Sequence, residues 1–267
     1  MRNALAIARK ELSIYFTTPW AYVVFTAMVG ITAFFFVGSL SFFRTINELA
    51  RNMGWARMPG EYQSFKNLTD GVIAPLWGVM IVITAIVAPI LSMRLFAEEK
   101  RNKTFELLMT APVRPIEIVL GKYLGGLVIV TTTLGLTILF PLILSLYGKS
   151  ESGSALEWST ILLGYLGVLL YGASCLAVGM FVSSLTESQM LAGVITIIVM
   201  LALLLVKGLT QTADEPLRSI VGYLSFDSQL QNLMKGVLDL KAIVYVASIS
   251  VFFIFLTHRS VEAQRWS

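Results

Sequence analysis

The chain has 267 residues, of which 56% are hydrophobic and only 13% are charged, and its formal net charge is +4. A soluble domain carries about 25% charged residues, so this composition excludes a soluble protein and indicates one embedded in a membrane. The small positive charge does not indicate a nucleic-acid partner, because in a membrane protein the distribution of charge matters more than its sum.

Residues 1–18 are predicted to form an amphipathic helix ahead of the first long apolar run. Its apolar face comprises Leu5, Ala8, Leu12, Tyr15 and Phe16, and its polar face carries Arg2, Arg9 and Lys10. This pattern is typical of a helix that lies in the membrane interface, and a short cytoplasmic helix without membrane contact is the alternative. Pro19 is expected to begin the next helix, with Thr18 as its cap.

Six apolar runs are long enough to cross a bilayer, which takes about 20 residues in a helix. They cover roughly 19–43, 71–93, 119–147, 158–183, 190–207 and 242–257. The connecting segments are shorter than the 50 or so residues of an independent domain, so residues 1–267 are predicted to form one all-α transmembrane domain. An even number of spans places both termini on one side. Lys and Arg are dense near the N-terminus and after the second span, which predicts that this side is cytoplasmic.

Charge is concentrated between the second and third spans, where residues 94–113 read RLFAEEKRNKTFELLMTAPV. Arg94 and Glu98 are four residues apart, as are Glu99 and Lys103. Opposite charges at this spacing meet on one face of a helix. A polar helix is therefore expected to continue from the second span below the membrane.

A second short helix is predicted between Thr104, its cap, and Pro112, which ends it. Glu106 in its first turn suits the helix dipole. Phe105, Leu108 and Met109 share one face, and the chain has no soluble core to bury that face. Such a face usually marks a surface for a partner, and the alternative is an interfacial helix that rests on lipid.

Residues 225–240 contain another helical pattern, formed by Phe226, Leu230, Leu233, Met234 and Val237. Two interpretations stay open. The segment is either a re-entrant or interfacial helix that forms an outer gate, or a surface amphipathic helix without a gating role. The loops 44–70 and 208–241 suggest no further role.

Catalytic chemistry is not predicted. The triplet at 148–150 matches the end of a phosphate-binding loop, but Ile143 stands where that loop needs glycine. One histidine, His258, and one cysteine, Cys175, cannot form a metal cluster or a nucleophile pair, so neither an enzyme nor a cofactor in this chain is expected. The span interiors lack charged residues, which disfavours an ion-coupled transporter.

The run at 94–113 closely resembles the signature of type-2 ABC transporter permeases, in which an arginine, an AEEK-like run, a Thr-x-Glu and a proline follow the second of six spans. In that family the segment contains a coupling helix that docks in a cleft of a separate ATP-binding subunit. The matching positions are Glu98, Glu99, Lys100, Thr104, Glu106 and Pro112. Phe105 and Leu108 join this docking set from their predicted face.

The segments 10–25 and 260–266 resemble the gliding-motility branch of these permeases, which shades into a nitrous-oxide-reductase maturation branch. The resemblance implies two permease chains, as a homodimer or heterodimer, and two ATP-binding subunits that hold ATP and Mg²⁺. It also implies a bacterial inner membrane and either export or mechanical work on an envelope partner. A non-transporting anchor for an ATPase or a motility component, and an ion-coupled secondary transporter, are the alternatives.

Overall fold

The computed structural model describes residues 2–110, 112–147, 156–209 and 226–264, and the regular elements in these ranges are helices. The α-helices are α1 (Arg2–Thr17), α2 (Pro19–Met53), α3 (Ala74–Ser92), α4 (Arg94–Arg101), α5 (Phe105–Thr110), α6 (Pro115–Thr137), α7 (Leu139–Tyr147), α8 (Trp158–Leu185), α9 (Gln189–Leu209), α11 (Phe226–Met234) and α12 (Leu240–Ala263). Three short turns, η1 (Trp55–Arg57), η2 (Gly60–Lys66) and η3 (Thr69–Ile73), connect α2 to α3. This confirms the predicted all-α fold.

Five helices in the described residues are long and apolar enough to span a membrane: Ala21–Met53, Thr69–Arg101, Pro115–Tyr147, Trp158–Leu185 and Leu240–Ala263. They match five of the six predicted spans. The remaining one corresponds to α9, in which Gln189–Leu205 forms a shorter apolar helix. The protein is therefore a multi-pass membrane protein.

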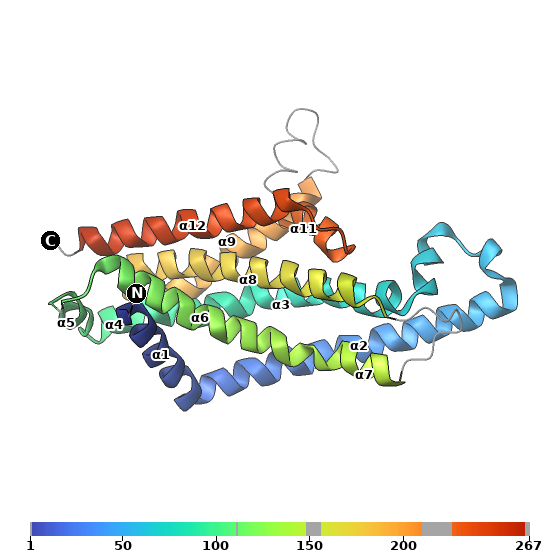
Figure 1. The fold of residues 1–267 in the computed structure, drawn as a ribbon, viewed down its shortest axis with the longest axis horizontal. Helices are drawn as coiled ribbons and strands as arrows, with labels where there is room; N and C mark the ends of the chain where they lie inside the picture. The colour runs from blue at the N-terminus through green and yellow to red at the C-terminus, as the bar shows by residue number, and fades with distance from the viewer. Residues whose placement is uncertain (1, 111, 148–155, 210–225, 265–267) are drawn as a thin grey trace.

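The long helices run side by side, with α8 packed against α3, α6, α9 and α12 (Figure 1). Helix α1 crosses α6 at one end of this bundle, where α4, α5 and the last turns of α12 also lie. The core of the bundle is apolar and includes Trp77, Tyr171 and Leu176, each with no exposed surface. Glycine lets α3 approach α8 closely, because a Cβ at Gly164 would lie 2.3 Å from Trp77 Cε2.

One boundary and one helix cap differ from the predictions. Helix α2 continues to Met53, so the expected loop at 44–70 begins as helix. Ile46 and Ala50 keep the helical period there and pack with Met58 in a small separate core. The helix ends at Gly54, whose φ of 80° favours glycine. Pro19 does begin α2, but Thr18 makes no side-chain cap.

Candidate functional site

Helix α4 is packed into the bundle. Leu95, Phe96 and Ala97 are at most 1% exposed, and α4 contacts α8. The helix does continue beyond the second span as predicted, with its Arg94–Glu98 ion pair at 2.9 Å, but its apolar side is buried, so it is not a free polar stalk. One side of a charged helix is buried here because its apolar residues meet the end of α8.

A serine of α8 holds the junction between α3 and α4. The chain leaves α3 at Ser92 and enters α4 at Arg94. At this break the N–H groups of Phe96 and Ala97 donate to Ser183 Oγ at 3.1 and 3.0 Å. The Ser183 hydroxyl itself donates to the Met93 carbonyl at 2.9 Å. One side chain thus satisfies the backbone on both sides of the break.

We expect Ser183→Ala to loosen this junction, because it removes the side-chain acceptor that the Phe96 and Ala97 N–H groups share. The expected cost is about 1–2 kcal/mol, since hydrogen bonds inside membrane proteins contribute modestly. Hydrogen exchange of peptides that cover α4 should become faster. Ser145→Ala is the control, because the exposed Ser145 hydroxyl bonds only its own helix. Equal exchange in both variants would contradict the role of Ser183.

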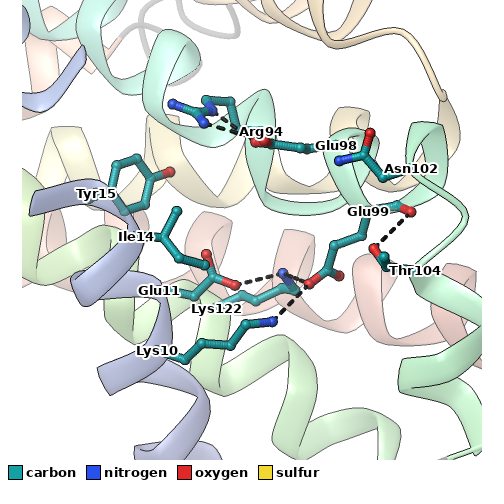
Figure 2. Close-up of a pocket in the computed structure, with 10 residues that line it drawn as sticks. All are labelled: Lys10, Glu11, Ile14, Tyr15, Arg94, Glu98, Glu99, Asn102, Thr104 and Lys122. Atoms are coloured by element: carbon teal, nitrogen blue, oxygen red, sulfur yellow. Dashed lines mark hydrogen bonds and ion pairs between the residues drawn. The ribbon is translucent and has the colours of Figure 1, made fainter. Parts of the chain in front are cut away.

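Three charged side chains from α1, α4 and α6 meet at this end of the bundle (Figure 2). Lys122 Nζ lies 2.8 Å from Glu11 Oε1 and 2.9 Å from Glu99 Oε1. The side chains of Lys122 and Glu11 are only 2% and 9% exposed. Lys10 Nζ approaches Glu99 Oε1 to 3.8 Å from the surface. We call Glu11, Glu99 and Lys122 the ion cluster.

The ion cluster replaces the predicted Glu99–Lys103 pair. Lys103 stands just after α4 with a φ of 56°, so the helix ends before it, and the Glu99 side chain faces α6 instead. A cavity of about 220 Å³ adjoins the cluster. It is lined by Lys10, Glu11, Ile14, Tyr15, Arg94, Glu98, Glu99, Asn102, Thr104 and Lys122.

Helix α1 lies against α6, and its buried face differs in part from the predicted apolar face. Ala4, Ala8, Glu11 and Tyr15 are buried, whereas Leu5 is 64% exposed. Phe16 is also exposed. Leu5 and Phe16 therefore do not belong to the face that contacts the bundle, while they remain suited to contact lipid.

Glycines of α6 allow this close contact. A Cβ at Gly121 would lie 2.7 Å from the Ala4 carbonyl oxygen, and one at Gly125 would lie 2.9 Å from Glu11 Cβ. Small residues four positions apart commonly let membrane helices pack this way. At the other end of α1, Tyr15 donates its hydroxyl hydrogen to the Leu91 carbonyl of α3 at 2.5 Å, and burial raises the pKa of Tyr15.

The short helix α5 presents a different face from the one predicted. Phe105 is only 8% exposed and its ring lies 6.3 Å from that of Phe96. Leu108 is half-buried against the core. Leu107, by contrast, is 71% exposed. Phe105 is therefore covered by the bundle, Leu107 is an exposed apolar residue of α5, and the side chain of Met109 lies outside the described part of the chain.

The other predicted docking residues lie around this segment. Lys100 Nζ donates to the Ser184 carbonyl and lies 5.5 Å from the Phe105 ring centroid. The Thr104 hydroxyl donates to the Glu99 carbonyl at 3.3 Å. Glu106 and Pro112 are exposed. On α1, Arg9 is exposed, and the side chain of Arg2 lies outside the described part of the chain.

The residues predicted as an outer gate lie inside the protein. Phe226, Leu230 and Leu233 are at most 1% exposed, and Met234 is half-buried. Their helix, α11, packs on α8 and α12, with the Phe226 ring 5.3 Å from that of Tyr171. Residues 210–225, part of the predicted outer loop, lie outside the described residues.

These features define a polytopic membrane protein with a short helical segment, α4–α5, at one end of its bundle. A family model described as ABC-2 family transporter protein matches residues 5–258. The chain therefore belongs to the ABC-2 family and is a membrane-embedded permease subunit. Such permeases generally work with an ABC ATP-binding subunit and usually lack a catalytic site of their own. No curated protein matches the chain.

Proposed function

We propose that α4 and α5 couple ATP binding and hydrolysis in a separate ATP-binding subunit to movement of the transmembrane helices. The observation that supports this proposal is the difference in side-chain exposure between α5 and α4. Leu107 on α5 is 71% exposed, whereas Leu95, Phe96 and Ala97 on α4 are at most 1% exposed. A partner can therefore bind at one end of a segment whose other end is packed into the bundle.

Three connections would carry the displacement from α5 into the bundle. Met93 joins α4 to α3 along the chain. Ser183 bonds the backbone of α4 to α8. Glu99 binds Lys122 of α6. A segment held at several points transmits a displacement, whereas a flexible loop would absorb it.

The proposed docking face consists of the exposed residues of α5 and the turn before it, Thr104, Glu106, Leu107 and Thr110. Leu107 would fill an apolar pocket in the partner, and Glu106 would meet a polar or basic rim. Phe105 acts from inside, because its ring against Phe96 fixes the orientation of α5.

The proposed assembly contains two permease chains and two ATP-binding subunits in a bacterial inner membrane, with the α5 end in the cytoplasm. ATP and its Mg²⁺ would be held by the ATP-binding subunits. The output is export of a substrate or, as in the gliding-motility branch, mechanical work on an envelope partner. Substrate flux in vesicles that contain the complex would distinguish the first output from the second.

The test is affinity purification in a mild detergent followed by mass spectrometry. We expect Leu107→Asp to lower recovery of the ATP-binding subunit by about tenfold or more, because a charge in a buried pocket removes well over 1 kcal/mol of binding free energy. Val237→Asp is the matched control, because Val237 is 58% exposed and lies between α11 and the start of α12, away from the end of the bundle that carries α5 (Figure 1). The proposal fails if the native chain recovers no ATP-binding subunit, or if both variants recover it equally.

A further inference from the structure

We infer that the ion cluster is a latch that makes α1 move together with α4 and α5 as one rigid unit. This inference rests on the proposed function of α4 and α5 and extends it to α1. It follows from where the three charged groups come from. Glu11 lies on α1, Glu99 on α4 and Lys122 on α6, and one ammonium group binds both carboxylates (Figure 2).

The first argument concerns charge. The Lys122 side chain is 2% exposed, and a buried lysine needs carboxylate partners to remain charged. Separating α1 from α6 would remove Glu11 from that lysine. Separating α4 from α6 would remove Glu99. Either movement leaves buried charges with fewer partners, so the three helices are held in one arrangement.

The second argument concerns packing around the ion cluster. Gly121 and Gly125 lie on either side of Lys122 and leave room for α1, where added Cβ atoms would meet α1 within 3 Å. The ion pairs therefore sit inside a close helix contact. Two further bonds tie α1 in place, from Tyr15 to the Leu91 carbonyl at 2.5 Å and from Asn3 to Glu117 at 3.0 Å.

The consequence is a second route for force. Helix α4 follows α3 in the chain, while α1 leads directly into α2 through Thr18. If α1 and α4 move as one unit, a displacement at α5 reaches α2 as well as α3. The ion cluster is thus a positioning element that joins two transmembrane helices to one docking site.

The test measures the distance between α1 and α4 by spin labels at Ser13→Cys and Arg101→Cys, two exposed positions. The native cysteine, Cys175, has no exposed surface and is not expected to react with the label. We expect a single narrow distance distribution in the otherwise native chain. Neutralising the cluster with Glu11→Gln, Glu99→Gln and Lys122→Met together should broaden the distribution, although the packing of α1 on α6 remains.

Two further variants make the result specific. Arg94→Gln with Glu98→Gln is the matched control, because it removes an ion pair within α4 that joins no two helices. Its distance distribution should stay narrow. Glu11→Leu removes the link from α1 to the cluster while leaving Lys122 paired with Glu99, and serves if the triple variant does not fold. An unchanged narrow distribution in Glu11→Leu or in the triple variant would overturn the latch.

A second readout separates the latch from the proposed function. In the purified complex, the distance from Ser13 to a label at Val251→Cys on α12 should shift on addition of ATP. The neutral variant should lose that shift while the ATP-binding subunit still copurifies. If α1 and α4 are locked in the isolated chain but no ATP-binding subunit binds the native protein, the proposed function fails and the latch stands. A shift that persists in the neutral variant would contradict the latch alone.

Discussion

Lys122→Met is expected to destabilise the protein by about 3–5 kcal/mol, because removing one partner of a buried ion pair leaves uncompensated charge. Here two carboxylates would lose their counterion, since both Glu11 Oε1 and Glu99 Oε1 lie within 2.9 Å of Lys122 Nζ. The free energy of unfolding can be measured by denaturant titration in mixed micelles.

The control for this variant neutralises the two carboxylates as well as removing the lysine. Lys122→Met combined with Glu11→Gln and Glu99→Gln should recover most of the lost stability, because neutral groups cost less to bury than unpaired charges. Native-like stability of Lys122→Met alone would show that water already reaches the two carboxylates, contrary to the burial of this cluster.

Gly164→Leu is expected to destabilise the bundle by about 1–3 kcal/mol or more, as overpacking of a close contact does. Its Cβ alone would lie 2.3 Å from Trp77 Cε2, and Trp77 has no exposed surface into which its ring could move. Tryptophan fluorescence during thermal unfolding should show an earlier transition.

Gly78→Leu is the matched control for that substitution. Gly78 neighbours Trp77 on α3, but a Cβ there would meet nothing within 4 Å. Its midpoint should stay at the native value or rise slightly, because glycine is a poor helix former. A second variant, Trp77→Leu with Gly164→Leu, should regain part of the loss. Equal midpoints for the two single glycine variants would contradict the close approach of α3 to α8.

Local patterns in the sequence predicted the elements of this fold well. The apolar runs of sufficient length form the long helices, and Pro19 begins α2 as expected for a residue without an N–H. The Arg94–Glu98 pair formed because its partners are neighbours on one helix turn. In these cases, the residues that form the pattern and the residues that they contact are close together in the chain.

The errors arose where the outcome depends on residues far apart in the chain. Glu99 pairs with Lys122 rather than with Lys103, because α4 ends before Lys103 and the Glu99 carboxylate lies 2.9 Å from Lys122 Nζ. Phe105 is buried because its ring packs against the ring of Phe96. The short-range pattern of α5 identified an apolar helix, but it could not tell which side another part of the bundle would cover.

The face of α1 shows the same limit. Glu11 was not singled out, although its spacing from Ala8 and Tyr15 places it among the buried residues of the helix. The Glu11 carboxylate on an otherwise apolar face could have predicted a buried positively charged partner. Gly121 and Gly125 on α6 determine that Ala4 and Ala8, rather than the larger Leu5, face the bundle.

The most direct test of the central claim, that α5 is the dock for an ATP-binding subunit, is photocrosslinking from position 107 in intact membranes. A photoreactive amino acid in place of Leu107 should give a crosslink to a protein with an ATP-binding site. The same group at Val237, away from the end of the bundle that carries α5, should give none. Crosslinks to lipid alone from position 107 would contradict the account and make α5 a helix that rests on the membrane surface.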